Sequence, residues 1–367
     1  MLLYDFIEYW ASSRLLLSGQ NPYSPTQLLA LQKSVGWNDA IPLIMWNPPW
    51  TLTLLVPFGS LDFITAQLLW IALLAVSALF SSRRLWHLYG GNPSHYGFGW
   101  IMALSFAPTI GSFFLQQINV LTVVGIVGFL HFVARDKHWQ AGLSLVLVTV
   151  KPHLYFLFWL ILLFWIVERR AWRLITGFLV GMLCVSAIPL ALDRRIFSEF
   201  LELYLIAPPP KPLDWETATL ARAFRHFIDE DQIWLQYIPA VVGIVWACGY
   251  WIKLRATWDW TKNLPLILVV SVMTNLFAWS HDQVVILPAL IQGAAWCAGT
   301  RDRRNARLTL AAYVAIELVI FAVKFFTAYD FWYFWLASVW TIFYWFVRKT
   351  MLADKQIDSP STYPVPG

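Results

Sequence analysis

Charged residues are scarce in this sequence of 367 residues. Lys, Arg, Asp and Glu together make up 13% of it, whereas a soluble domain carries about 25%. Hydrophobic residues make up 59%, and the mean hydropathy is +0.59. Several apolar runs are long enough to cross a hydrocarbon core of roughly 30 Å. The composition excludes an ordinary soluble domain and predicts an integral membrane protein with many spans.

Cysteines are few, and several common cofactor motifs are missing. The three cysteines, Cys184, Cys248 and Cys297, lie inside apolar runs without metal-ligand spacing, so we interpret them as lipid-facing or core residues. The net charge of +5 is not accompanied by a basic surface interleaved with aromatic residues, which argues against a nucleic-acid partner. The sequence has no Walker loop, no dinucleotide glycine motif and no His-rich metal site.

The apolar runs predict an all-α, polytopic bundle of about eleven spans. They cover residues 62–82, 98–115, 119–134, 139–150, 154–167, 174–192, 237–253, 264–279, 284–299, 308–326 and 331–347. Spans 139–150 and 154–167 meet at Lys151-Pro152, either as two short helices or as one broken helix. An unwound join is tolerated at membrane depth only where protein or a water-filled cavity covers it.

The positions of Lys and Arg predict the orientation. Alternating the eleven spans places 17 of the 26 basic residues in short loops on one side, which we assign to the cytoplasm of a multi-pass cell-membrane protein. The outer side then receives two long segments, 1–61 and 193–236, and residues 1–353 form a single domain. The first contains an amphipathic stretch over 25–33, and the second contains Pro208-Pro209-Pro210 and a helix-like stretch over 217–228. The polar, Pro-rich tail 354–367 is expected to be a disordered cytoplasmic segment.

The N-terminus carries no signal peptide, and the first outer segment begins at residue 1. Either a short N-terminus crosses the membrane unaided, or a preceding helix is missing, which we favour. No internal repeat is visible, and this weakens the case for an inverted-repeat transporter.

Polar side chains gather at the predicted outer ends of the spans. They are Asp5, Glu8, Asn47, Gln116, Gln117, Asn119, Lys151, His153, His281, Asp282 and Asp330. Polar groups at membrane depth are costly and mark substrate pathways or satisfied interhelical contacts. We therefore expect a shared cavity that opens outward.

Four of the ionisable residues have a chemical and a structural interpretation. Asp5 can take a proton from a hydroxyl nucleophile, or it is an N-cap or surface carboxylate. Lys151 can bind a phosphate, or a buried carboxylate such as Asp282 is its counter-ion. His281 can donate to a phosphate or orient a carboxylate, or it is a hydrogen-bonded filler. Arg222 can grip a lipid phosphate, or it is an interfacial anchor.

Two further motifs also have a chemical and a structural interpretation. The amides of Gln117 and Asn119 can bind sugar hydroxyls, or Asn119 only caps the helix that follows. The segment Trp46-Asn47-Pro48-Pro49-Trp50 offers aromatic surfaces to a sugar or a prenyl chain, or it is simply a helix start. Glu317 and Lys324, seven residues apart, are interpreted as a structural polar contact within the membrane.

The order of the motifs resembles the GT-C glycosyltransferases of family 87, which include polyprenol-phosphate-mannose-dependent α-mannosyltransferases. The residues that carry the resemblance are Asp5-Phe6 with Tyr9-Trp10, Gly19-Gln20-Asn21-Pro22-Tyr23, Pro48-Pro49-Trp50, Gln117-Ile118-Asn119, Lys151-Pro152 and Ser280-His281-Asp282. It covers most of the chain, and its opening stretch is the most specific part. The sequence departs from the family in two places. Only four residues precede Asp5, where the family has a helix, and Gln116-Gln117 stands where the family usually has Gly-Gln.

The resemblance implies a transmembrane hexosyltransferase, with mannose as the default sugar, that works on the extracytoplasmic side with inversion. Its donor would be a polyprenyl-phosphate sugar, its acceptor a lipid or glycan, and it would use no soluble cofactor and no metal. The catalytic carboxylate would be Asp5, and His281 would lie near the donor phosphate, to which Lys151 and Arg222 are added as further candidates. The residues expected to bind substrate are Glu8, Tyr9, Asn47, Trp50, Gln117, Asn119 and Asp282. A lipid or solute transporter with the same outward cavity is the alternative, and a structural subunit of an envelope-glycan complex is a third.

Overall fold

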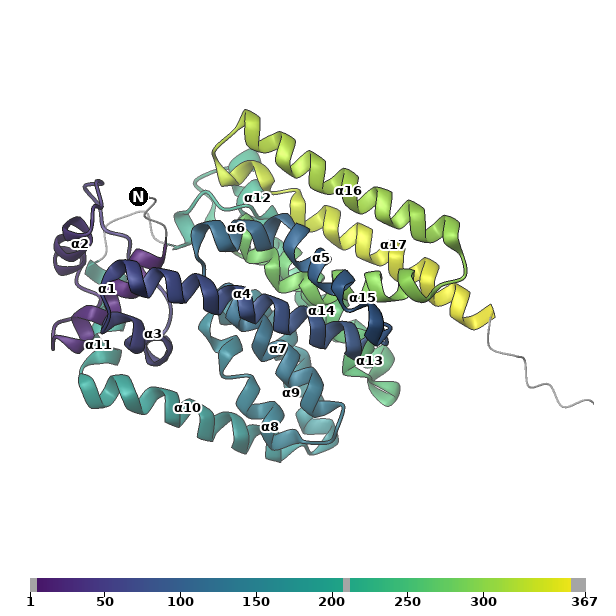
Figure 1. Cartoon of the computed structure of the whole chain (residues 1–367), viewed down its shortest axis with the longest axis horizontal. Helices are drawn as coiled ribbons and strands as arrows, with labels where there is room; N and C mark the ends of the chain where they lie inside the picture. The colour runs from purple at the N-terminus through teal and green to yellow at the C-terminus, as the bar shows by residue number, and fades with distance from the viewer. Residues whose placement is uncertain (1–4, 207–211, 358–367) are drawn as a thin grey trace, which may run out of the picture.

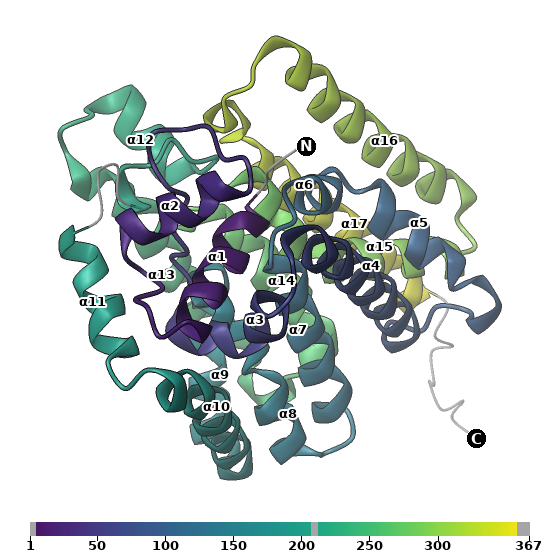
Figure 2. The ribbon, with the colours of Figure 1, turned by 60° about the vertical axis from the view of Figure 1, so that its left-hand side comes forward.

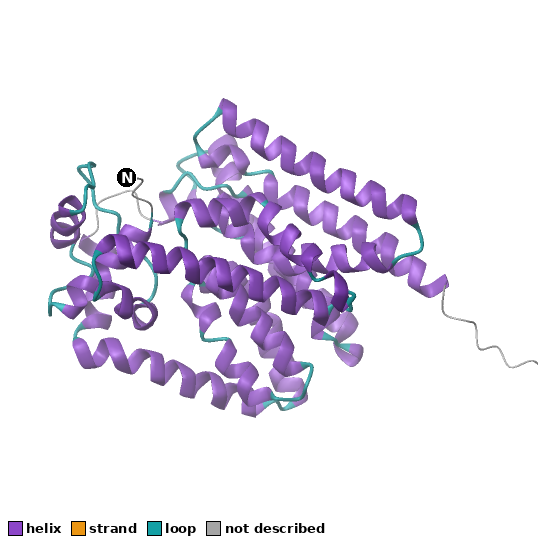
Figure 3. Ribbon diagram, in the orientation of Figure 1, coloured by secondary structure: helices purple, strands orange, loops and turns teal. Residues whose placement is uncertain are grey.

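The computed structural model describes residues 5–206 and 212–357, and in these residues every regular element is a helix, without strands (Figure 3). The all-α prediction is confirmed. The α-helices are α1 (Phe6–Leu17), α2 (Pro25–Ser34), α3 (Leu52–Gly59), α4 (Phe63–Leu88), α5 (Gly97–Ser105), α6 (Ala107–Leu115), α7 (Asn119–Val133), α8 (His138–Ser144), α9 (Phe156–Arg169), α10 (Trp172–Leu192), α11 (Ile196–Ile206), α12 (Leu220–Ile228), α13 (Ile238–Leu254), α14 (Trp260–Met273), α15 (Leu287–Gly299), α16 (Arg303–Phe326) and α17 (Leu336–Ile357).

Aspartates fix where several long helices begin. The side chains of Asp62, Asp259 and Asp302 each accept hydrogen bonds from backbone N–H groups in the first turn of α4, α14 and α16. Such caps satisfy donors that have no partner inside the helix. Each cap therefore sets the boundary between a polar loop and an apolar run.

Residues 5–206 and 212–357 contain five helices that are long and apolar enough to cross a membrane, and a sixth candidate in two pieces. The five are Phe63–Leu88, Pro152–Arg169, Trp172–Leu192, Ile233–Thr257 and Arg303–Phe326. The sixth candidate joins Pro93–Ser105 to Ala107–Leu115 with a bend of 63°. The predicted count of about eleven is not confirmed.

Several predicted spans are shorter or more broken than the hydropathy suggests. The run 264–279 contains the end of α14 at Met273 and then leaves the helix, and the run 284–299 begins in the 3-10 helix η8 (Ser280–Ile286). Two further 3-10 helices, η3 (Leu147–Val150) and η4 (Pro152–Tyr155), flank Lys151. Spans 139–150 and 154–167 are therefore separate short helical segments on either side of this residue.

Two glycines allow α8 and α10 to touch. A Cβ at Gly142 would come within 2.0 Å of the Leu174 carbonyl oxygen, and a Cβ at Gly177 within 2.0 Å of that of Trp139. Small residues permit this close approach of membrane helices, whose association depends on van der Waals contact. The contact holds α8, and hence the segment that leads to Lys151, against a long helix.

The helices of the first outer segment gather at one end of the molecule. Helices α1, α2 and α3, together with α11 of the second outer segment, lie at the end where the chain enters α4 (Figures 1 and 2). The last turns of α17 lie toward the opposite end. The last turns of α4 and the first turns of α10 and α16, where several basic residues occur in the sequence, lie away from α1 and α2 (Figure 1). This arrangement agrees with the predicted sidedness, and the extracytoplasmic orientation itself remains a prediction.

The outer helical stretches are largely as expected. Helix α2 covers the predicted amphipathic stretch 25–33. In the second segment, α12 begins at Leu220 rather than 217, because the Thr219 hydroxyl caps it by accepting the Arg222 N–H at 3.1 Å. The triple proline 208–210 lies outside the described residues. Of the expected tail, residues 354–357 continue α17, and residues 358–367 lie outside the described residues.

Candidate functional site

The Gln117 side chain links a carboxylate to an ammonium group. Its amide nitrogen donates to Asp5 Oδ2, and its Oε1 accepts from Lys151 Nζ at 2.8 Å and from the Tyr9 hydroxyl at 3.0 Å. Asp5 immediately precedes α1, Gln117 lies in the tight turn between α6 and α7, and Lys151 lies between η3 and η4. Three breaks in helical structure therefore bring together residues that are far apart in the sequence.

The turn that carries Gln117 depends on an unusual backbone conformation at Gln116. Gln116 closes α6 with φ +58°, in the left-handed region that favours glycine. Its carbonyl oxygen accepts from the Trp70 indole at 2.8 Å, and its Oε1 accepts from Gln67 at 3.1 Å. These bonds from α4 hold a non-glycine residue in a left-handed backbone conformation.

Lys151 forms a buried ion pair with Asp282. Lys151 Nζ lies 2.7 Å from Asp282 Oδ1, and the two side chains are 11% and 2% exposed. The sequence left a phosphate and Asp282 as alternative counter-ions, and the structure contains the pair with Asp282. An ammonium group has three donors, of which Gln117 and Asp282 use two. One N–H of Lys151 is therefore left for a further acceptor.

Asn119 holds the His281–Asp282 segment in place. Its amide nitrogen donates to the His281 carbonyl oxygen at 3.0 Å and to Asp282 Oδ1 at 3.2 Å. Asp282 Oδ2 accepts the Trp279 N–H at 3.1 Å. Asn119 makes no capping bond to α7, which begins without a side-chain cap. The capping interpretation of Asn119 is therefore wrong, because its amide is used between helices.

The charges in this cluster depend on burial. Burial alone would raise the pKa of Asp282, but the Lys151 ammonium and the neighbouring histidines hold that pKa well below its usual range. Burial lowers the pKa of His281 to about 4, so its imidazole is neutral at pH 7. His281 Nε2 lies 3.9 Å from Asp282 Oδ1, is buried, and has no hydrogen-bond partner among the described residues.

Asp5 and Glu8 are two carboxylates at the start of α1. Burial raises the pKa of Asp5, while the Gln117 hydrogen bond and the Lys151 charge lower it. Burial also raises the pKa of Glu8 well above its usual value, and the charge of Asp5 raises it further. Two neighbouring carboxylates in one apolar setting divide into an ionised and a protonated partner. The hydrogen bond from Gln117 and the charge of Lys151 favour Asp5 as the ionised one.

Asn47 and Trp50 use their polar atoms on the chain just before Lys151. The Asn47 amide donates to the Val150 carbonyl oxygen at 3.0 Å, and the Trp50 indole donates to the Thr149 hydroxyl at 2.9 Å. Both side chains thus position Lys151. Their predicted contact with substrate stays a prediction.

A wall of aromatic rings adjoins the cluster. Trp279 is stacked with His281 at a centroid distance of 6.4 Å and an interplanar angle of 9°. Trp215 lies 5.8 Å from Trp279 and 6.0 Å from Trp46, measured between centroids. Trp46 belongs to the Trp-Asn-Pro-Pro-Trp motif. Trp215 was not singled out from the sequence, because nothing separates it from the other 22 tryptophans. The sequence also did not indicate Ser112, whose hydroxyl donates to the His281 carbonyl oxygen at 3.0 Å, because it belongs to no recognisable motif.

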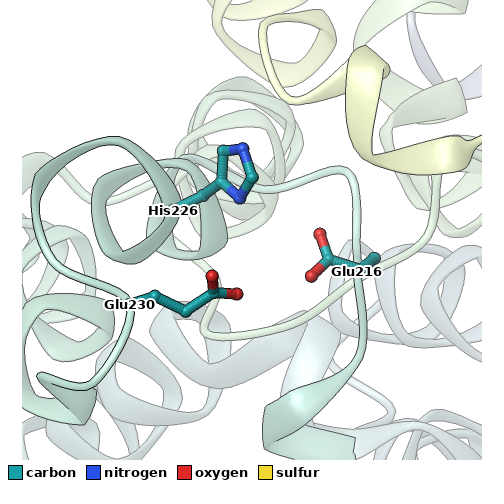
Figure 4. A group of neighbouring side chains, drawn as sticks. All are labelled: Glu216, His226 and Glu230. Carbon is teal, nitrogen blue, oxygen red and sulfur yellow. The ribbon is translucent and has the colours of Figure 1, made fainter.

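Arg222 belongs to a different cluster on the second outer segment. Its guanidinium donates to Glu216 and, at 2.6 Å, to Glu230. Within residues 5–206 and 212–357, Glu216, His226 and Glu230 form a group whose ligand atoms lie within 4.8 Å of one another (Figure 4). The group has the ligand types for a cation, but the Arg222 guanidinium already pairs with both of its carboxylates. The predicted contact of Arg222 with a donor phosphate stays a prediction.

The comparison with protein families identifies the chain. The model of glycosyltransferase family 87 matches residues 46–288. The match includes Gln117, Asn119, Lys151, His281 and Asp282 and begins after Asp5. No curated protein and no solved structure matches the chain. Because the family model covers well over half of the sequence, the chain belongs to glycosyltransferase family 87 and is a membrane glycosyltransferase.

Proposed function

We propose that the protein transfers a hexose from a polyprenyl-phosphate donor to a lipid or glycan acceptor on the outer face of the cell membrane, with inversion and with Asp5 as general base. The observation that carries this proposal is the single amide of Gln117, which bonds to Asp5 on one side and to Lys151 on the other. A base and a phosphate-binding cation are thus held one side chain apart.

Lys151 and His281 provide the phosphate site. The third N–H of Lys151 faces no partner among its described hydrogen bonds and binds a phosphate oxygen. The neutral imidazole of His281 donates one N–H to the same phosphate, and the unpartnered Nε2 supports this role. Asp282 fixes the position of Lys151 and balances its charge.

The reaction needs one proton transfer and one displacement. Asp5 takes the proton of the acceptor hydroxyl as the acceptor oxygen attacks the anomeric carbon. The bond between that carbon and the phosphate oxygen breaks, and its electron pair stays on the polyprenyl phosphate. The leaving phosphate needs no proton, because Lys151 and His281 stabilise its charge. Attack opposite the leaving group inverts the configuration.

The aromatic wall gives the sugar a binding surface. Trp279 and Trp215 lie beside His281, and one face of a hexose ring has apolar C–H groups that fit an aromatic ring. We place the transferred sugar between this wall and Asp5. Membership of a glycosyltransferase family favours this function over the transport alternative.

Radiolabelled polyprenyl-phosphate sugars test the proposal. Membranes that contain the protein are expected to move label to a lipid or glycan, with an anomeric configuration opposite to that of the donor. Asp5→Asn is expected to lower turnover by roughly 100-fold or more, the usual contribution of a general base. Asp39→Asn is the matched control, since it makes the same substitution at an exposed carboxylate that makes none of the described hydrogen bonds. Unchanged turnover in Asp5→Asn, or retained configuration, overturns the mechanism. Label transferred only from nucleotide sugars overturns the proposed donor.

A further inference from the structure

The strongest feature outside the catalytic cluster is a polar cavity of about 330 Å³ between α1, α2 and α11. Its lining includes Gln20 and Asn21 after α1, Gln27 on α2, and Arg195, Ser198 and Glu199 at the start of α11. A second cavity of about 430 Å³ shares Gln20 and Gln27 with it and continues along α1 and α2. These helices lie side by side in both views (Figures 1 and 2).

The motif Gly19-Gln20-Asn21-Pro22-Tyr23 forms one wall of the cavity, and most of its residues have a structural task. Gly19, at φ +69°, ends α1, and the N–H of Gln20 bonds back to the Leu15 carbonyl oxygen at 2.9 Å. The Asn21 side chain accepts the Tyr23 N–H at 2.8 Å, and the buried Tyr23 ring lies 5.3 Å from that of Phe200 on α11. Gln20 is the exception, because its side chain is exposed and makes none of the described side-chain hydrogen bonds.

Buried acceptors without partners point to a ligand. Glu199 is 5% exposed, and its Oε2 has no hydrogen-bond partner among the described residues, while its other oxygen pairs with Arg195 at 3.3 Å. The Oε1 of Gln27 is also buried without a partner. A buried acceptor that is left unpaired costs free energy, which a donor from a bound ligand would recover.

The chemistry of the lining selects a neutral ligand rich in hydroxyl groups. Gln20 and Gln27 offer both donors and acceptors in planar amides, and Glu199 offers a strong acceptor. The carboxylates of Glu199 and Glu202 disfavour an anion, and Arg195 disfavours a cation. The larger cavity adds the apolar side chains of Leu15 and Leu31 along one side. Carbohydrate has this combination of hydroxyl groups and apolar C–H faces.

We propose that this cavity is a second carbohydrate subsite, which binds sugar residues of the acceptor at a distance from the reacting hydroxyl. The inference rests on the proposed function, because it assumes a glycan acceptor. Helix α1 has 12 residues, so its rise of 1.5 Å per residue separates Asp5 from the cavity by roughly 18 Å. An acceptor that reaches both places has several sugar residues, and the subsite favours long acceptors over short ones.

Binding and turnover are measured separately. The purified protein is titrated with linear oligosaccharides of mannose, of glucose and of galactose, one to six residues long, and binding is detected by saturation-transfer NMR. The wild-type protein is expected to bind the longer members of at least one series. The variant Gln20→Ala/Gln27→Ala is expected to weaken that binding by roughly tenfold, since two hydrogen bonds are lost. Thr26→Ala is the matched control, because Thr26 is exposed on α2 and does not line either cavity.

The kinetic arm tests the acceptor role. In Gln20→Ala/Gln27→Ala, the KM for the long acceptor is expected to rise by the same factor of about ten by which binding is weakened. The kcat and the KM for the donor are expected to stay unchanged. Equal oligosaccharide binding in the wild type and the double variant overturns the subsite, as does binding of Ca²⁺ in place of sugar. An equal loss of kcat with every acceptor also overturns it. If no polyprenyl-phosphate sugar is turned over but oligosaccharides bind at Gln20, the donor proposal fails and the subsite stands.

Discussion

Variants of the ion pair between Lys151 and Asp282 distinguish its contribution to stability from its contribution to catalysis. Lys151→Met removes the charge and keeps the length of the chain, and Asp282→Asn removes the opposite charge and keeps the shape. The two side chains are 11% and 2% exposed, so each single variant leaves one charge buried without its counter-ion. We expect both single variants to be destabilised and the double variant Lys151→Met/Asp282→Asn to recover part of the loss.

The contacts that survive set the size of each effect. Breaking a buried pair costs about 3–5 kcal/mol. In Lys151→Met, Asp282 keeps the N–H of Trp279 and the amide of Asn119, which places the cost near the lower end of this range. In Asp282→Asn, the ammonium keeps Gln117 Oε1 and the amide oxygen of the new residue, so a similar cost is expected. The double variant leaves no buried charge at the pair and should lose less than the sum of the two singles by about 2 kcal/mol or more.

Unfolding in detergent, followed by tryptophan fluorescence, gives the order of stability, and transfer of labelled sugar gives the activity. The double variant is expected to be more stable than the additive value and to remain inactive, because the donor phosphate loses Lys151. Additive losses of stability would refute the coupling that the 2.7 Å pair implies. A double variant that is stable and fully active would refute the role of Lys151 in donor binding.

Three further changes test other parts of the site. As a general base, Asp5 must be ionised, so activity is lost as the pH falls through its pKa. The hydrogen bond from Gln117 lowers this pKa, and Gln117→Leu should therefore move the acidic limb of the pH profile of kcat to higher pH. An acidic limb that does not move contradicts the assignment of Asp5 as the base. Asn119→Ala should destabilise the fold by about 1–3 kcal/mol and raise the KM for the donor, measured by denaturation and initial rates, because two buried acceptors lose a donor. Gln116→Gly should keep stability and activity, because relief of about 1–2 kcal/mol of left-handed backbone strain offsets the lost hydrogen bond to Gln67. Gln116→Val should lower both stability and activity. Equal melting temperatures for the two variants would contradict this reasoning.

The sequence predicts which polar residues lie close together better than it predicts the contacts between them. Asp5, Lys151 and His281 were grouped because charged or polar residues in apolar surroundings need partners, and this physical requirement does not depend on the fold. The apolar runs indicate a break at 116–118, but they do not indicate that the side chains of Gln117 and Asn119 connect these residues. The amide of Asn119 suits a helix cap as well as a contact between helices, so the residue type alone could not decide.

The number of spans was harder to predict for a related reason. Hydropathy measures the apolar character of a run and is insensitive to whether the run stays helical. The segment from Asn275 to Ile286 is almost entirely buried or half-buried, yet it leaves the α-helix and forms η8. Its backbone is satisfied by protein groups, such as the bonds to Ser112 and Asn119 at the His281 carbonyl oxygen. Irregular backbone of this kind is stable at membrane depth only inside protein.

The arrangement of charges explains why Lys151 needs both Gln117 and Asp282. In the proposed reaction, Asp5 starts as an anion and ends neutral, while the donor phosphate starts with one negative charge and ends as a monoester with about −1.5 to −2. Negative charge therefore moves from the Asp5 side of Gln117 to the Lys151 side. Lys151 pairs directly with Asp282 and is separated from Asp5 by the Gln117 amide, so we expect it to act mainly on the charge that develops on the phosphate. An interaction that strengthens during the reaction acts on kcat. Lys151→Met should accordingly reduce kcat more than it raises the KM for the donor, and the opposite ratio would assign Lys151 to donor binding alone.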